Sequence, residues 1–331
     1  MGRSFAGTIV NGFTMHQSLK ISLLLILCNG LSGQIPAVEL VGSPQALTPD
    51  GEYYMAPRWS PDGRTLAVTG SNYTGIYLVD FPGGQVRQLA ENQEAGTGMV
   101  WAPTGELILT TVSKFENRRR YNAIVIVDVL TAAQTRITDY ATGPTGSVFW
   151  AGNGQSIHLI DHDNQPRRFN LAGEPVEASA QFLAANRQVY AKGVEIVRSG
   201  AALGATEVIP TVEGRKLNLA VSPDGARVAF EIVGGNLWVM NIDGSHAIDI
   251  GLGNRPAWNP AGDKLAYIIT EDDGHRILAA DIHVVNVDGT GRLNLTQSED
   301  LLEMHPAWSP DGRYIAYDDL TTGRIFVQEV R

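Results

Sequence analysis

Three side chains that could do chemistry occupy the same place in a recurring motif of this sequence. Asn218, Arg255 and His305 each lie three residues before a Trp or the residue that replaces it. A guanidinium can bind an anion, an imidazole can act as a base, and an amide can donate or accept hydrogen bonds. Pro follows Arg255 and His305, so we expect an extended backbone at both. The equivalent uncharged residues of the other motif copies are Ala56, Gly98, Ser147 and Ser179. We expect each of the seven residues to begin the innermost strand of its repeat unit.

A second candidate site is the basic segment from Lys114 to Tyr121, in which Arg118, Arg119 and Arg120 precede Tyr121. Guanidinium groups beside an aromatic ring suit an anionic partner, although a solvated loop can have the same composition. We therefore predict partner-binding roles for these three arginines and Tyr121, together with the three motif residues above.

Acidic residues near the last two motif copies could hold a divalent cation, because carboxylate and imidazole groups are suitable ligands. These residues are Glu271, Asp272, Asp273, Glu299, Asp300 and Glu303, with His275 and His305. They follow no fixed metal-binding spacing, so we predict no cofactor and assign no catalytic or metal-ligating residue. The sequence also lacks a Gly-x-Ser-x-Gly elbow and a Gly-rich phosphate loop followed by Lys. Enzymatic activity stays an open question, with a non-enzyme favoured.

The motif itself is Trp-Ser-Pro-Asp-Gly or a relative of it, and it recurs about every forty residues. Pro, Asp and Gly together close a tight turn, and a β-branched or aromatic stretch follows each turn as a second strand. The clearest copies contain Trp59, Trp101, Trp150, Trp258 and Trp308, and two degraded copies contain Phe182 and Val221. A repeat of this length and kind indicates an array of small sheets that closes into a β-propeller.

Each unit contains sequence for about four strands, and the two chain ends complement each other. The last unit stops after its third strand, Ile325–Val330, whereas a fourth-strand pattern, Gln45–Thr48, precedes the first motif. We therefore predict an all-β propeller of seven four-stranded blades, with the N-terminal strand completing the last blade. Six blades are the alternative, if the degraded unit around Phe182 merges with a neighbour.

The turn motif, a third strand such as Ile76–Asp80 and a Leu-Thr fourth strand together resemble the TolB-type propeller repeat, a relative of the WD repeats. The resemblance covers residues 45–331 and implies the propeller fold. The same repeat occurs in periplasmic scaffold proteins, in the non-catalytic domain of prolyl-peptidase-like enzymes and in some polysaccharide lyases. The resemblance therefore implies an architecture that serves several functions.

The N-terminal residues are of a different kind. Lys20 precedes the apolar run Ile21–Cys28, and small and polar residues follow up to Gly33, which is the order of a secretory signal peptide. Met15 is a plausible start, cleavage is expected after Gly30 or Gly33, and a membrane anchor is the lesser alternative. We thus predict an extension and signal peptide over 1–33, a lead-in over 34–44 and one propeller domain over 45–331.

The charge of the chain limits the classes of partner that it is expected to bind. The chain has 331 residues with 25 Lys and Arg against 35 Asp and Glu, a formal net charge of −10, which disfavours nucleic acid. We predict an exported, periplasmic or extracellular, non-enzymatic module that binds a protein or another cell-envelope partner. The alternative is a carbohydrate-active lyase or hydrolase with its site at the mouth of the ring. A small ligand in the central channel is possible, and membrane contact is expected only through an uncleaved leader.

Overall fold

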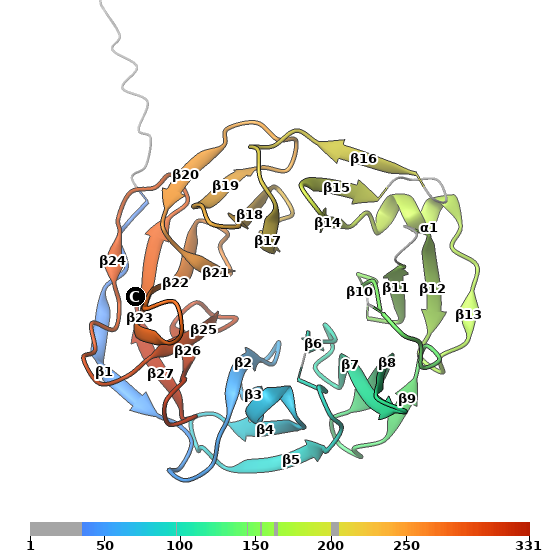
Figure 1. Cartoon of the computed structure of the whole chain (residues 1–331), viewed down its shortest axis with the longest axis horizontal. Coiled ribbons are helices and arrows are strands. Elements are labelled where there is room, and N and C mark those ends of the chain that lie inside the picture. The colour runs from blue at the N-terminus through green and yellow to red at the C-terminus, as the bar shows by residue number, and fades with distance from the viewer. Residues whose placement is uncertain (1–34, 97, 144, 153, 162–164, 200–204) are drawn as a thin grey trace, which may run out of the picture. The chain divides into compact units, whose positions relative to one another are not determined.

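Seven antiparallel sheets follow one another in chain order around a common axis in the computed structural model (Figure 1). The structure describes residues 35–331 except 97, 144, 153, 162–164 and 200–204, so the predicted signal peptide lies outside the described residues. The prediction of a seven-bladed propeller is confirmed, and the six-bladed alternative is wrong.

Each blade begins with its innermost strand and proceeds outwards. Blade 1 contains β2 (Met55–Trp59), β3 (Thr65–Thr69), β4 (Ile76–Asp80) and β5 (Val86–Ala90), with a 3-10 turn at Ser71–Tyr73. Blade 2 contains β6 (Val100–Trp101), β7 (Leu107–Glu116), β8 (Arg119–Asp128) and β9 (Gln134–Arg136). Blade 3 contains β10 (Ser147–Trp150), β11 (Ser156–Ile160), β12 (Pro166–Asn170) and β13 (Pro175–Val176).

Blades 5 and 6 repeat this order. Blade 5 contains β17 (Lys216–Val221), β18 (Arg227–Ile232), β19 (Leu237–Asn241) and β20 (Ile248–Gly251). Blade 6 contains β21 (Asn254–Trp258), β22 (Lys264–Asp272), β23 (Ile277–Asn286) and β24 (Leu293–Asn294).

Blade 7 closes the ring with strands from both ends of the propeller. It contains β25 (Glu303–Trp308), β26 (Tyr314–Asp319) and β27 (Ile325–Val330), and its outer strand is β1 (Leu40–Ala46). β1 pairs antiparallel with β27, with Leu40 opposite Val330 and Ala46 opposite Phe326. The predicted closure by an N-terminal strand is confirmed, and this strand begins at Leu40, earlier than the expected Gln45.

Blade 4 departs from the repeat. Its described strands are β14 (Val189–Lys192), β15 (Glu195–Ser199) and β16 (Thr206–Ile209), and the helix α1 (Ala180–Ala185) precedes them. Phe182 therefore lies in a helix, and the expectation that Ser179 begins an inner strand is wrong. Ser179 instead caps α1, where its side chain accepts a hydrogen bond from the Phe182 N–H. The Pro and Gly of the turn are missing here, and Ala, Gln and Leu favour a helix after a Ser cap.

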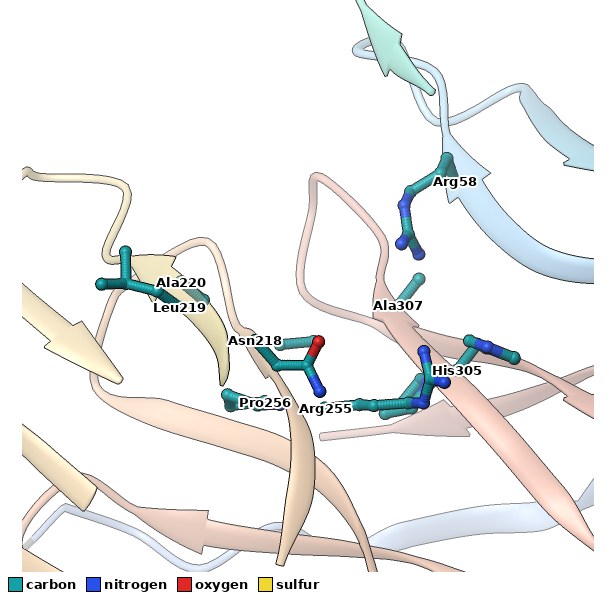
Figure 2. Close-up of a pocket in the computed structure, with 10 residues that line it drawn as sticks. Arg58, Asn218, Leu219, Ala220, Arg255, Pro256, His305 and Ala307 are labelled. Carbon is teal, nitrogen blue, oxygen red and sulfur yellow. The ribbon is translucent and has the colours of Figure 1, made fainter. Parts of the chain in front are cut away.

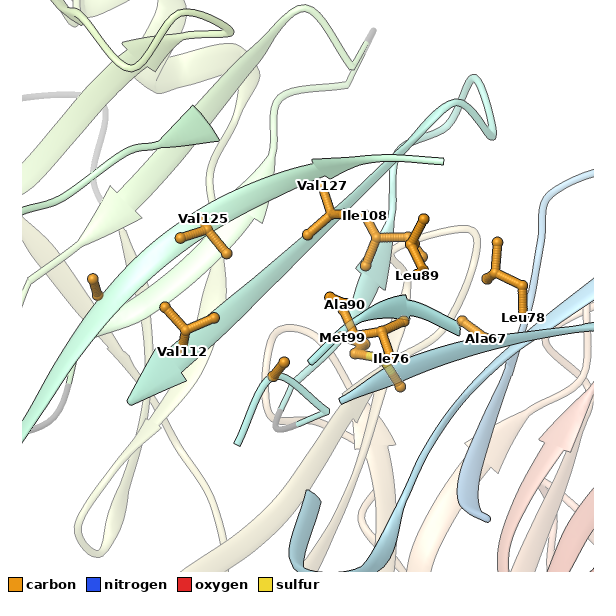
Figure 3. Packing of buried hydrophobic residues seen from close by; sticks show 12 residues of the cluster. Ala67, Ile76, Leu78, Leu89, Ala90, Met99, Ile108, Val112, Val125 and Val127 are labelled. Carbon is orange, nitrogen blue, oxygen red and sulfur yellow. The ribbon is translucent and has the colours of Figure 1, made fainter. Parts of the chain in front are cut away.

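The hydrophobic core lies between neighbouring blades. Between blades 1 and 2, Ile76 and Leu78 pack with Ile108, Val112 and other buried side chains of the same cluster (Figure 3). The motif Trp adds a polar link across four of the interfaces between neighbouring blades. Trp59 Nε1 donates to the carbonyl oxygen of Ala307 in the preceding blade at 3.0 Å. Trp101, Trp150 and Trp258 donate in the same way to Arg58, Val100 and Ala220.

This hydrogen bond gives Trp59 a role in stability besides hydrophobic packing. We expect Trp59→Phe to lower the free energy of unfolding by about 1–3 kcal/mol, because the variant loses the donor to Ala307 and part of the packed ring. Trp308 provides a matched comparison, since its Nε1 is buried without a hydrogen-bond partner among the described residues. Urea unfolding should show a smaller loss for Trp308→Phe, and an equal loss would contradict a contribution from the hydrogen bond.

Candidate functional site

The three motif residues lie at a bulge that recurs in the inner strands. In blade 6, Asn254 pairs with Ile268 and Ala257 pairs with Ala266, so β21 holds one residue more than β22 over this stretch. The φ angles are 46° at Asn218, 53° at Arg255 and 48° at His305, all in the left-handed region. The expectation of an extended backbone at Arg255 and His305 is therefore wrong. The bulge overrides the usual preference of a residue before Pro.

Buried carboxylates from the preceding blade hold the bulges in place. Glu231 of blade 5 accepts a hydrogen bond from the backbone N–H of Arg255 in blade 6. Asp318 of blade 7 accepts one from the backbone N–H of Ala56 in blade 1, at 3.0 Å. A left-handed non-glycine residue costs on the order of 1–3 kcal/mol, and such tertiary hydrogen bonds oppose that cost.

The bulges border a pocket of about 370 Å³ at the axial ends of blades 1, 5, 6 and 7, which we call the central pocket (Figure 2). Its lining residues are Arg58, Asn218, Leu219, Ala220, Arg255, Pro256, Ala257, His305, Pro306 and Ala307. The structure thus brings together the three motif residues that the sequence singled out. It adds Arg58, which the sequence reasoning missed. Arg58 is the only charged residue that directly precedes a motif Trp or its substitute, and this was the available signal.

Two guanidinium groups dominate the charge of the central pocket. Arg58 and Arg255 come from blades 1 and 6, and both side chains are turned towards the small Ala307 of blade 7 (Figure 2). Arg58 Nη1 donates to the carbonyl oxygen of Pro57 at 3.0 Å. The Arg255 side chain forms no hydrogen bond or ion pair with the described residues. The Arg58 side chain is exposed to the pocket. The protein around it lowers the pKa of Arg58, Asp318 opposes this and Arg255 adds to it, yet an arginine stays protonated at neutral pH.

His305 and Asn218 are held by carboxylates at the edge of the pocket. His305 is buried, and its Nδ1 lies 2.9 Å from Asp318 Oδ1, while its Nε2 is buried without a hydrogen-bond partner among the described residues. Asn218 Nδ2 donates to Glu231 Oε1 at 2.8 Å. In this arrangement the imidazole has no nitrogen open to a substrate, whereas the two arginines can bind an anion.

The acidic residues considered for a cation have other roles where the structure defines them. Asp272 and Asp273 accept backbone N–H groups of the β22–β23 turn, including that of His275 at 2.9 Å. Glu303 is only 1% exposed, and burial raises the pKa of its carboxyl to about 7. Within the described ranges, no group of three or more His, Cys, Asp and Glu side chains could hold a metal ion. The prediction that the chain holds no cofactor stays untested.

The basic segment forms the hairpin of β7 and β8 in blade 2 and does not line the central pocket. Arg120 pairs with Glu94, and its Nε donates to Asn122 Oδ1 at 2.9 Å. Tyr121 lies beside Lys114, whose Nζ is 5.9 Å from the centre of the ring. Both side chains thus help to build the hairpin. The other two predicted arginines, Arg118 and Arg119, are exposed at the tip of the hairpin. Neither forms an ion pair within the described part of the chain.

Comparison with known sequences gives a short match. No family model matches the chain. Over 60 residues it is 42% identical to an uncharacterized peptidase, YuxL, of Bacillus subtilis, a match that spans 17% of this chain and only 9% of that protein.

Solved structures match over much more of the chain. TolB from Acinetobacter baumannii has a TM-score of 0.51 at 20% identity, over 78% of this chain and 57% of that one. A putative TolB from Agrobacterium tumefaciens has a TM-score of 0.51 at 18% identity, over 87% and 93%. The Swd1 β-propeller domain of Myceliophteria thermophila has a TM-score of 0.57 at 12% identity, over 89% and 100%.

Among the described residues, no helix is long and apolar enough to cross a membrane. The order of the sheets and the closure by β1 define a ring of seven blades, and two TolB structures match its fold. The chain therefore adopts a TolB-like, seven-bladed β-propeller fold.

Proposed function

We propose that this chain is an exported, non-enzymatic binding module that docks a protein partner on one face of the propeller. This is the face that carries the connections from the second to the third strand of each blade, and we call it the loop face. Seven rigid sheets hold such connections at a low cost in ordering entropy, which suits recognition by a preformed surface. Export is proposed from the order of residues around Ile21–Cys28, outside the described part of the chain.

Two long hairpins on the loop face support docking. The β7–β8 and β22–β23 pairs contain strands of 9 or 10 residues, whereas the second strands of the other blades have 4 to 6. Each hairpin exposes one large apolar side chain near its tip. Phe115 is 59% exposed beside the free arginines, and Leu278 is 58% exposed beside the acidic turn. Aromatic residues and arginines are typical of residues that carry binding energy.

The opposite charges of the two hairpins favour a partner of matching polarity. The β7–β8 tip presents Arg118 and Arg119, while the β22–β23 tip presents Glu271, Asp272 and Asp273. Complementary charges across an interface orient the partner and exclude others. The single observation that carries the proposal is the presence of exposed apolar and exposed charged side chains at the tips of two elongated hairpins on the same face.

The carbohydrate-active alternative gains less support from the site. A lyase or hydrolase at the mouth of the ring would use His305 as a base, but its Nδ1 contacts Asp318 and its Nε2 is buried. General-base action needs a nitrogen within hydrogen-bond reach of the substrate proton. The binding module is therefore the function that we propose.

Site-specific photocrosslinking in the cells that produce the protein would test the docking face. A photoreactive residue at position 115 or 278 should give the same discrete adduct, because both positions would face one partner. Position 130 is a matched control, since Leu130 is 90% exposed but lies in the β8–β9 turn on the opposite face. Adducts of equal yield at position 130, or none at 115 and 278, would contradict the proposal.

Once the partner is purified, its affinity gives a quantitative prediction. We expect Phe115→Ala to weaken binding at least about tenfold, because truncation of a central aromatic contact commonly costs that much. Leu130→Ala should leave the dissociation constant unchanged. Isothermal titration calorimetry with both variants would measure the difference, and an unaltered affinity of Phe115→Ala would remove the hairpin from the interface.

A further inference from the structure

We propose that the central pocket binds a single carboxylate group between the guanidinium groups of Arg58 and Arg255. This inference does not rest on docking at the loop face. Both arginines line the pocket, and the small side chain of Ala307 leaves space between them (Figure 2). The ligand is a small carboxylic acid or one acidic side chain of a partner, which share this chemistry.

The arginines have unused capacity for an anion. Arg255 has no side-chain partner among the described residues, and the Arg58 guanidinium has one hydrogen bond, to Pro57. Each guanidinium carries five N–H donors in a planar fork that matches a carboxylate. The two positive charges also lie close enough for Arg255 to disfavour the charged form of Arg58. An anion between them would relieve this repulsion.

The site is built before any ligand arrives. The backbone N–H of Arg255 donates a hydrogen bond to Glu231. Trp59, which follows Arg58 in the chain, donates its indole N–H to the carbonyl oxygen of Ala307. The carbonyl oxygen of Arg58 accepts a hydrogen bond from Trp101 Nε1 at 3.0 Å. Both arginine backbones are thus fixed by bonds between blades, so binding has to order the side chains and not the backbone.

The charges around the pocket favour one carboxylate over a phosphate or a polyanion. Asp318 and Glu231 lie behind the pocket lining and offset part of the positive charge of the arginines. The chain as a whole has a net charge of −10, which repels multiply charged anions. The volume of about 370 Å³ is near the lower end of ligand pockets, which suits a small acid or a single side chain.

Titrations of the full chain with defined anions would test the assignment. The probes are acetate, N-acetylglutamate amide as a model of an acidic side chain, and inorganic phosphate, each at constant ionic strength. NMR signals of 15N-labelled arginine Nε–H groups report binding directly. We expect saturable shifts with the two carboxylates and weaker binding of phosphate. The tighter of the two carboxylates identifies the source, a free acid or a partner side chain.

Variants make the test specific. Arg58→Gln should weaken carboxylate binding at least about tenfold, because it removes a charged hydrogen-bonding group. Arg64→Gln is the matched control, since Arg64 is exposed in the turn between β2 and β3 and its replacement makes the same change in charge. The Arg58 side chain is open to the pocket, so Arg58→Gln should fold, and a thermal melt verifies this. Tighter binding of phosphate, no saturable binding, or an equal loss in both variants would overturn the proposal.

Discussion

Asp318→Ala is expected to lower the free energy of unfolding by about 3 kcal/mol or more, the range seen when one partner of a buried polar pair is removed. Asp318 is fully buried in β26. It accepts the Ala56 N–H at 3.0 Å and lies 2.9 Å from His305 Nδ1. The variant would leave both groups buried without their partner and would open a cavity.

The position of Asp318 adds to this effect. It joins blade 7 to blade 1, at the seam where the ring closes without a covalent link, and the two bonded residues are 262 positions apart in the chain. Urea unfolding monitored by tryptophan fluorescence measures the loss. Asp318→Asn keeps an oxygen acceptor and should cost clearly less. Asp50→Ala is an exposed control, because the Asp50 side chain in its ion pair with Arg324 is 82% exposed and such pairs contribute at most about 1 kcal/mol. A loss below that of Asp50→Ala would show that the carboxylate does not hold the seam.

The parts of the fold that the sequence predicts well are those in which local chemistry and tertiary packing agree. The turn of blade 1 is an example: Ser60 Oγ donates to Asp62 at 2.6 Å and accepts the Thr65 N–H at 3.0 Å. These contacts lie within six residues, and the same turn recurs at Ser222 and Ser309. Since the residues of each turn specify its conformation locally, the period, the blade count and the closing strand could all be predicted from residue types.

Blade 4 and the bulges show where this reasoning stops. Around Phe182 the period predicts an inner strand, but the local preference of Ala180–Ala185 for a helix prevails once the turn residues are lost. At Arg255 and Ala56 the left-handed backbone depends on the carboxylates of Glu231 and Asp318 from another blade. No local pattern contains those partners, and the Pro that follows Arg255 favours an extended conformation when considered alone.

The candidate site was predictable in part for the same reason. Asn218, Arg255 and His305 share one motif position, and equal positions of a repeat meet around the axis, as the central pocket shows. Arg58 stands two residues further along its inner strand, where the other blades carry uncharged side chains. Its contribution follows from the geometry of one pocket and not from the repeat. Likewise, the basic segment looked uniform in sequence, although Arg120 is engaged by Glu94 and its neighbours are not.

Glu303 should make the stability of the propeller fall as the pH rises from about 4.5 to about 7. Its carboxyl is 1% exposed in β25, one oxygen has no hydrogen-bond partner among the described residues, and burial raises its pKa to about 7 from an ordinary 4.5. Below pH 4.5 the group is protonated in both folded and unfolded chains, so its contribution is fully present. As the pH rises, the unfolded chain ionises first and is favoured, which by pH 7 or above corresponds to a loss on the order of 3 kcal/mol.

Glu303→Gln isolates this effect, because glutamine cannot ionise. Urea unfolding of the variant and the parent protein from pH 4 to pH 8 should give similar free energies at pH 4 and a growing advantage of the variant towards pH 8. Carboxyls such as Asp62 and Asp224, whose side-chain hydrogen bonds from serines lower their pKa, act with the opposite sign and at lower pH, and they cancel in the difference. Glu299→Gln, at an exposed position of the link before β25, should show no such trend. If the difference between Glu303→Gln and the parent protein stayed constant across this range, Glu303 would have to be ionised in the folded propeller, and its burial next to Tyr317 would need another source of stabilisation.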